Sequence, residues 1–321
     1  MYDVRRNTPH YQYLNRLNRL KSSKVLKSFN LNIQGGVFMA KAFSVASWNV
    51  EHFGRSKKNS NKPKKPIGPI VDYLASQKAD IVAVYEVVGK MVFGEVMKKM
   101  PGYQFHITEG PQSQEILVGV KKSISCFFTQ KTMFKSGASM LRPGALLTIT
   151  KEGVNYPLLF LHLKSLTEPK GFGLRDDMTE RAIKFKKKLD KAHKKSGLSG
   201  KSNFIFLGDL NTMGMNLTYS KKDVSAEEEI GRLGRRLSNK NVGMKILSKS
   251  TEGTYWPGSK SRYSVGNLDH VIAADHLEFK KFNGASVSVR GWVEEDNSTK
   301  RDQWAKKFSD HSLLYFEVQK V

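Results

Sequence analysis

The chain has 321 residues, and its 54 Lys and Arg against 29 Asp and Glu give a formal charge of +25. Its 39% content of hydrophobic residues excludes a wholly disordered or low-complexity chain, and its length suits one large α/β domain or two small ones. The single cysteine, Cys126, excludes an internal disulfide and a metal site built from several thiolates.

The composition also indicates the cellular compartment and the class of partner. A lone cysteine is typical of a reducing compartment, so we expect a cytoplasmic protein. No apolar run reaches the roughly 18 residues that cross a bilayer, so no membrane association is expected. The high positive charge favours a nucleic acid partner, although surplus lysine also serves solubility alone. No obligate protein partner is evident.

Residues 1–40 are basic and polar, which predicts a weakly ordered N-terminal extension. We hypothesise that translation starts at Met39, because the codons for Gln34 to Val37 can spell a ribosome-binding sequence. The alternative is a genuine basic arm that contacts nucleic acid. N-terminal sequencing of protein made from the native gene distinguishes the two, and recovery of Met1 contradicts the internal start.

Patterned structure begins with an apolar run from Phe43 to Val50, which predicts a first buried strand. Further strands are predicted at 80–87, 115–120, 145–150, 158–163, 203–207, 268–273 and 312–318. Several of these runs are almost continuous in apolar residues, as in strands that are covered on both faces. The segments 57–65 and 109–114 are rich in glycine, lysine or polar residues and are predicted to be loops.

Two helices are predicted from their N-terminal signals. Asp177 and Glu180 form a capping-box pattern ahead of an apolar stripe that ends near Gly197. The outer face of this helix is rich in lysine, either as a solvated face or as a stripe that contacts nucleic acid. Ser225 and Glu228 open a second helix within residues 214–250, a polar stretch that we interpret as an insertion.

Polar residues interrupt the apolar runs at or near their ends. They are Asn49, Glu86, His162, Asp209, Asn211, Asp269, Asp310 and His311. A single residue of this kind is more typical of a turn or a cap than of a site. Together they supply carboxylate, amide and imidazole groups without a thiolate, a set that suits Mg²⁺ or Mn²⁺ acting on phosphate.

These residues lie in motifs that resemble the endonuclease/exonuclease/phosphatase superfamily. The motifs follow the family's order: Trp48-Asn49-Val50, Tyr85-Glu86-Val87, Leu161-His162-Leu163-Lys164-Ser165, Gly208-Asp209-Leu210-Asn211-Thr212, Asn267-Leu268-Asp269-His270 and Ser309-Asp310-His311-Ser312. The resemblance spans nearly all of residues 42–319, within an expected domain of residues 41–321. It implies an α/β fold of the deoxyribonuclease type, a two-sheet, four-layer sandwich of mixed sheets with flanking helices.

The resemblance also implies roles for these residues. Glu86 corresponds to the principal carboxylate ligand of a Mg²⁺ or Mn²⁺ ion, assisted by Asn49 and Asp310. Asp209 and Asn211 resemble the pair that orients the attacking water and a phosphate oxygen. Asp269 resembles the acid that holds the tautomer of His311. Either the histidine or the aspartate deprotonates water in such enzymes, and both alternatives stay open.

Further matches favour the deoxyribonuclease-like members. Glu115 occupies the position of a glutamate that partners the second histidine, His162, which would protonate the leaving sugar oxygen; the alternative is a solvated acid at a strand edge. Arg142 resembles an arginine that contacts a substrate phosphate, and Asn211 and Lys164 complete the expected substrate-binding set. Val88 stands where pancreatic deoxyribonuclease has an arginine in the minor groove, which argues against that style of duplex recognition.

The expected function is therefore metal-dependent hydrolysis of phosphodiester bonds in nucleic acid, in DNA rather than RNA. One alternative is an esterase of the same fold that acts on a lipid head group or an inositol phosphate. A second alternative is an inactive module that only binds nucleic acid. The complete set of acids and imidazoles favours an enzyme over the second alternative.

Overall fold

The structure is a computed structural model that describes residues 40–54, 65–217 and 223–320. Apart from Ala40, the predicted N-terminal extension lies outside the described residues, as does all of the predicted 57–65 loop except Lys65. The interpretation of residues 1–40 as an extension therefore stays a prediction. The interpretation of 214–250 as an insertion also stays a prediction.

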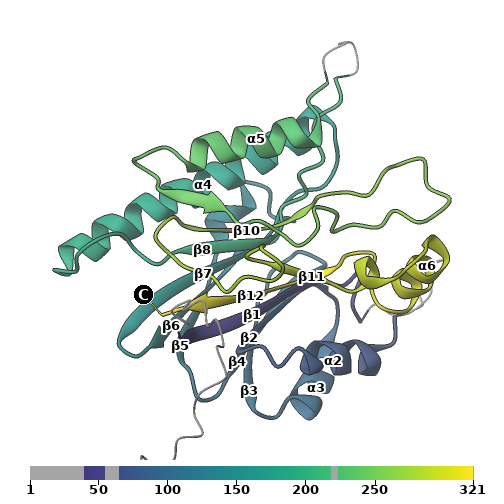
Figure 1. Cartoon of the computed structure of the whole chain (residues 1–321), viewed down its shortest axis with the longest axis horizontal. Helices are drawn as coiled ribbons and strands as arrows, with labels where there is room; N and C mark the ends of the chain where they lie inside the picture. Colours follow the sequence, from purple (N-terminus) through teal and green to yellow (C-terminus); the bar gives the residue numbers. More distant parts are fainter. Residues whose placement is uncertain (1–39, 55–64, 218–222, 321) are drawn as a thin grey trace, which may run out of the picture. The chain divides into compact units, whose positions relative to one another are not determined.

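The strands form two sheets (Figure 1). The first contains β1 (Lys41–Asn49), β2 (Ile81–Val87), β3 (Tyr103–Ile107), β4 (Glu115–Lys121), β11 (Ser288–Arg290) and β12 (Leu313–Gln319) in the order β11-β12-β1-β2-β4-β3. The second contains β5 (Ser125–Lys131), β6 (Gly144–Lys151), β7 (Val154–His162), β8 (Ile205–Asp209), β9 (Met244–Ile246) and β10 (Asp269–Ala274) in the order β5-β6-β7-β8-β10-β9. Only β1 with β2 and β7 with β8 pair in parallel, so both sheets are mixed.

Helices cover the outer faces of the two sheets (Figure 1). The helices are α2 (Ile67–Ser76), α3 (Lys90–Lys99), α4 (Pro169–Lys195), α5 (Ala226–Leu237) and α6 (Ser298–Lys307), with short 3-10 turns η2 (Thr132–Lys135) and η3 (Trp292–Glu294). Helices α2 and α3 pack on the first sheet, and α4 and α5 pack on the second. None of the described helices is both long and apolar enough to cross a membrane.

The alternation of side chains along β1 shows how the layers are built. Phe43 and Val45 point into the core between the sheets, whereas Ala46 and Trp48 join the cluster beneath α2 and α3. Full burial of a side chain such as Phe43 or Val45 contributes about 1.5–3 kcal/mol. This arrangement of helices, two mixed sheets and helices confirms the predicted four-layer sandwich.

Some of the predicted loops, helix starts and strands agree with the structure, and others do not. The 109–114 segment is a loop, and Ser225 caps α5 by accepting a hydrogen bond from the main-chain N–H of Glu228. The predicted start of α4 at Asp177 is wrong, because the helix begins at Pro169 and Asp177 instead accepts hydrogen bonds from Ser136 and Arg181. Sequence patterns also missed edge strands β3 and β5, whose residues are mostly partly exposed and lack a clean apolar period.

Asp80 joins β1 to the start of β2 in the first sheet. Its carboxylate accepts hydrogen bonds from the N–H and hydroxyl of Ser44, both at 2.9 Å, and from the ammonium of Lys121 at 2.8 Å. Burial acts to raise the pKa of Asp80, but these bonds and Lys41 outweigh it and lower the pKa to about 2. The ionised carboxylate therefore stabilises the fold.

We predict that Asp80→Asn lowers the free energy of unfolding by about 1–3 kcal/mol at pH 7, measured by urea denaturation. Because the pKa is lowered on folding, this contribution is present above pH 4 and is lost as the pH falls towards 2. Asp72→Asn is the matched control, since the exposed Asp72–Lys99 ion pair is worth less than about 1 kcal/mol. Equal losses in the two variants would contradict the account.

Candidate active site

The polar residues at the strand ends gather at one edge of the sandwich. Parallel neighbours end on the same side of a sheet, so β1 and β2 bring Asn49 and Glu86 together, and β7 and β8 bring His162 and Asp209 together. The antiparallel strands β10 and β12 begin at the same edge, where Asp269 is the first residue of β10 and His311 precedes β12 by two residues. The structure thus unites side chains that lie far apart in the sequence.

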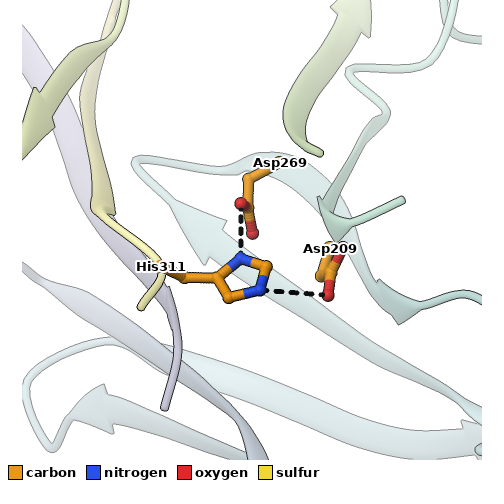
Figure 2. Close-up of side chains that lie close together, drawn as sticks. All are labelled: Asp209, Asp269 and His311. Atoms are coloured by element: carbon orange, nitrogen blue, oxygen red, sulfur yellow. Dashed lines mark hydrogen bonds and ion pairs between the residues drawn. The ribbon is translucent and has the colours of Figure 1, made fainter. Parts of the chain in front are cut away.

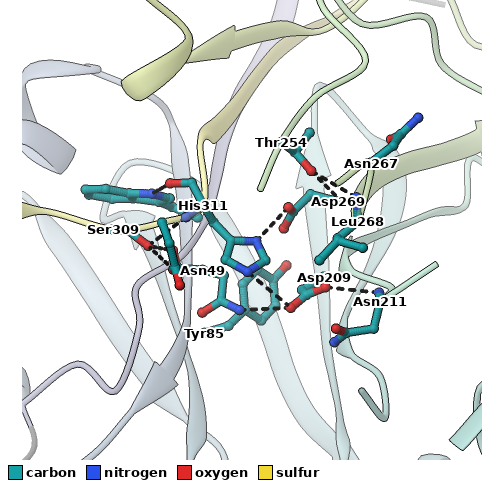
Figure 3. Close-up of polar contacts among 12 residues, drawn as sticks. Asn49, Tyr85, Asp209, Asn211, Thr254, Asn267, Leu268, Asp269, Ser309 and His311 are labelled. Carbon is teal, nitrogen blue, oxygen red and sulfur yellow. Dashed lines mark hydrogen bonds and ion pairs between the residues drawn. The ribbon is translucent and has the colours of Figure 1, made fainter. Parts of the chain in front are cut away.

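Asp209 lies at the centre of this cluster (Figure 3). Its Oδ2 accepts a hydrogen bond of 2.9 Å from the amide of Asn49, and its Oδ1 accepts one of 3.0 Å from the main-chain N–H of Asn211. The ring nitrogens Nε2 of His162 and His311 lie 3.5 and 3.9 Å from Oδ2. Burial, strengthened by the negative charge of Asp269, raises the pKa of Asp209 to about 7 against the opposing effect of His311.

Asp269 and His311 form a buried pair (Figure 2). The Nδ1 of His311 lies 2.8 Å from the Oδ2 of Asp269, and a carboxylate only accepts, so Nδ1 carries the proton. Burial disfavours a charged imidazole, but the negative charges of Asp269 and Asp209 outweigh it and raise the pKa of His311 well above its ordinary value. The pair has the geometry that the sequence predicted.

Glu86 occupies an unusual backbone conformation. Its φ is +61°, and the pairing of β2 with β4 shifts register between Val84 and Val87. Its Oε2 accepts hydrogen bonds from the main-chain N–H of His52 at 3.0 Å and from the amide of Gln114 at 2.6 Å. Its Oε1 is left facing Asn49 at 3.5 Å and His162 at 3.8 Å.

The predicted pair of Glu115 with His162 is not formed. Glu115 accepts hydrogen bonds from Thr108 at 2.6 Å and Gln112 at 2.7 Å, while the buried Nδ1 of His162 has no hydrogen-bond partner. Burial, together with the positive charges of Arg142 and His311, lowers the pKa of His162 well below its ordinary value. No carboxylate therefore binds Nδ1, although Nε2 lies 3.5 Å from Asp209 and 3.8 Å from Glu86. A neutral imidazole is a poor proton donor to the leaving oxygen.

Arg142 lies within electrostatic range of Glu86 and Asp209, and its role as a phosphate contact stays a prediction. Its Nη2 donates to the carbonyl of Leu163 at 3.3 Å, and its buried Nε has no partner. Burial lowers the pKa of Arg142, while the charges of Glu86, Asp209 and Glu115 oppose that shift. Glu115 therefore lies within electrostatic range of Arg142, although it does not pair with His162.

Lys164 and Asn211, the other two predicted substrate-binding residues, make mainly loop contacts. The carbonyl of Lys164 accepts a hydrogen bond from Arg175, and no contact among the described residues ties its ammonium to the cluster. The amide of Asn211 donates to the carbonyl of Leu163 at 3.2 Å, with the backbone in a left-handed conformation at φ +50°. Asn211 thus fixes the loop that follows β8.

Acidic and amide groups beside Glu86 suit a divalent cation. The Oδ1 of Asn49 is buried without a hydrogen-bond partner. Burial raises the pKa of Asp310; among nearby charges, His311 and Lys65 oppose this rise, whereas Glu51 and Glu86 add to it. A buried acceptor beside crowded carboxylates is the donor set that Mg²⁺ or Mn²⁺ prefers, so these residues fit the expected metal.

Other residues position the cluster without having been predicted. The hydroxyl of Ser309 donates to the carbonyl of Asn49 at 2.7 Å and accepts from the N–H of His311 at 3.1 Å (Figure 3). The hydroxyl of Thr254 accepts a hydrogen bond of 3.0 Å from the main-chain N–H of Asp269. His52 and Gln114 hold Glu86, and only the nearness of His52 to Asn49 in sequence offered any signal for them.

Gly208 allows β8 to approach its neighbours at this edge. Its φ is +135°, and a Cβ at this position would collide with the carbonyl oxygen of Leu161 and lie 2.7 Å from the hydroxyl of Tyr85. That hydroxyl lies 3.0 Å from the hydroxyl of Ser47 on β1, so Tyr85 fills the space between the two sheets. Glycine is therefore required immediately before Asp209.

Comparison with solved structures finds similar folds in TDP2 and in a protein described as an endonuclease/exonuclease/phosphatase. Truncated TDP2 from Caenorhabditis elegans matches at a TM-score of 0.58 and 17% identity, over 87% of this chain and 98% of that chain. TDP2 from D. rerio, in complex with a single-strand DNA product, matches at 0.56 and 15% over 87% and 99%. An endonuclease/exonuclease/phosphatase from Beutenbergia cavernae matches at 0.54 and 12% over 87% and 72%.

No protein-family model and no curated protein sequence matches the chain. The likeness to solved structures confirms the expected deoxyribonuclease-type sandwich, and at these identities it establishes the fold alone.

We predict that Gly208→Ala destabilises the protein by more than about 2 kcal/mol, because the added methyl group displaces β8 from β7. Thermal denaturation measures the loss. Gly94→Ala is the matched control, since a Cβ at this exposed position of α3 meets open space and alanine favours a helix. An unchanged melting temperature for Gly208→Ala would show that the close approach is absent.

Proposed function

We propose that this chain is a divalent-metal-dependent phosphodiesterase that hydrolyses nucleic acid, with DNA preferred over RNA. One observation supports the proposal above the others. Asn49, Arg142 and His162 each have a buried polar atom without a hydrogen-bond partner. Asn49 and His162 face Asp209 through their other polar atom, and the charge of Asp209 acts on Arg142. Leaving such atoms unpaired costs free energy that a bound ligand recovers, and an acceptor, a cationic donor and an imidazole suit a metal and a phosphate group.

Glu86, Asn49 and Asp310 would hold the metal. When bound, a divalent cation would neutralise charge that develops on the phosphate oxygens. The Oε1 of Glu86 is available because His52 and Gln114 bind Oε2. Asp209, Asp269 and His311 also lie within 4.8 Å of one another and form an alternative cation site. We assign them to proton transfer instead, because Asp269 already accepts the proton of His311.

Asp209 and His311 act together on the attacking water in this mechanism. Asp269 fixes the tautomer of His311, so that Nε2 faces Asp209. The two groups interact closely, and their titration belongs to the pair rather than to either residue. The pair takes a proton from water, Arg142 binds a phosphate oxygen, and neutral His162 donates or accepts a hydrogen bond beside the phosphate.

The choice of nucleic acid as substrate rests on the net charge of the chain and on its similarity to a solved structure. A formal charge of +25 suits a long polyanion better than a single head group. A structural neighbour, TDP2 from D. rerio, is described in complex with a single-strand DNA product. The preference for DNA and a cytoplasmic location are part of this proposal.

The substrate class is tested with purified protein, Mg²⁺ and a panel of labelled duplex DNA, single-stranded DNA, RNA and an inositol phosphate. We expect cleavage of DNA, with slower cleavage of RNA, and loss of both with EDTA. Asp209→Asn is expected to lower kcat by about 10² to 10⁴, because proton transfer is lost. Intact nucleic acids beside a hydrolysed inositol phosphate would overturn the substrate assignment.

Separate variants distinguish metal binding from proton transfer. Glu86→Gln is expected to raise the Mg²⁺ concentration for half-maximal activity by roughly tenfold or more, because a charged ligand is lost. Asp269→Asn is expected to lower kcat by about 10² to 10⁴ without changing that concentration, since it removes only the partner of His311. If Asp269→Asn shifts the metal dependence and Glu86→Gln does not, the roles of the two clusters are reversed.

A further inference from the structure

A groove on the outer surface of α4 is lined mainly by cations. It has a volume of about 360 Å³, and Arg181, Lys184, Lys187, Lys188 and Lys191 line it together with Asp177. Met133 of η2 contributes to the wall opposite the helix. This groove shares no residue with the cluster around Asp209.

The charge of the groove is not balanced within the protein. Arg181 pairs with Asp177, and Lys184 pairs with Glu180. No carboxylate in the described part of the chain lies within ion-pair distance of the exposed Lys187, Lys188 or Lys191. Lys191 lies four residues after Lys187 and three after Lys188, so it neighbours both of them on the helix surface and like charges repel there. The repulsion destabilises α4 unless an anion occupies the groove.

The groove is connected to the candidate active site through the segment between β5 and β6. The hydroxyl of Ser136 donates to Asp177 at the start of the groove. Lys135, beside Ser136, donates to Gln112 at 2.7 Å, and Gln112 in turn binds Glu115. Arg142, six residues after Ser136 in the sequence, borders the catalytic cluster. Contacts of the segment between β5 and β6 therefore run from the groove to Glu115, whose charge acts on Arg142.

We propose that this groove binds backbone phosphates of the nucleic acid substrate, away from the bond that is cut; the proposal rests on the proposed function. The N-terminus of α4 follows His162, and 15 to 22 residues separate Pro169 from Lys184 and Lys191. At about 1.5 Å per residue this is roughly 23–33 Å. At about 3.4 Å per base pair, only duplexes that extend some 7–10 base pairs beyond the site reach the groove.

The test compares two triple variants of equal charge. Lys187→Gln, Lys188→Gln and Lys191→Gln remove the cations of the groove. Lys78→Gln, Lys98→Gln and Lys122→Gln remove exposed lysines from the side of the first sheet. Binding of a labelled 30-base-pair duplex is measured by fluorescence anisotropy in EDTA at several salt concentrations. Hydrolysis of that duplex and of the p-nitrophenyl ester of thymidine 5′-phosphate is measured with Mg²⁺.

The groove variant is expected to bind the duplex about tenfold more weakly, with the slope of log Kd against log salt reduced by about 2–3. Its kcat on the small ester is expected to stay unchanged, and the control variant is expected to match the wild type. Equal weakening in both variants, or in neither, overturns the proposal. Because binding is measured without hydrolysis, a duplex that is bound through the groove but not cut contradicts the proposed function alone.

Discussion

The carboxylate of Asp209 links the two sheets at the edge that holds the candidate active site, and the other polar groups are arranged around it. It ends β8 of the second sheet, yet it accepts a hydrogen bond from Asn49 on β1 of the first. His311, which precedes β12, approaches the same oxygen. An ionised carboxylate that is buried in this way is costly, and the cost is offset only while amide, main-chain and imidazole donors surround it. The packing of the sheets and the chemistry of the site therefore depend on the same contacts.

Two backbone features make this convergence possible. The register shift in β2 turns Val87 towards the same helix-side cluster as Val82 and Val84, and it leaves Glu86 in a left-handed conformation beside Asn49. Gly208 lets β8 lie against Tyr85 and the backbone of β7. Strained conformations of this kind persist where the surrounding structure enforces them, and they are concentrated at functional sites.

The sandwich and the Asp269–His311 pair were predicted from motifs that resemble a known family, and these motifs stand out in the sequence because polar residues interrupt apolar runs at or near their ends. The sequence did not predict that Glu115 binds Thr108 and Gln112 instead of His162, since those contacts depend on how a loop folds. Gln114, in the same loop, was not predicted either, although its amide donates a hydrogen bond to Glu86. The start of α4 was predicted at Asp177 because this residue matches a capping pattern. In the structure Asp177 instead binds Ser136, the residue that follows η2. Polar residues at strand ends were thus predictable, whereas the hydrogen-bond partners that loops supply to them were not.

The central claim is that Glu86, Asn49 and Asp310 hold the metal while Asp209, Asp269 and His311 move protons. Crystals of the protein soaked in Mn²⁺ and measured at the manganese absorption edge test it most directly. The account predicts an anomalous peak beside the Oε1 of Glu86 and the Oδ1 of Asn49, with the hydrogen bond between Asp269 and His311 intact. A peak among Asp209, Asp269 and His311, with that hydrogen bond broken, would contradict it.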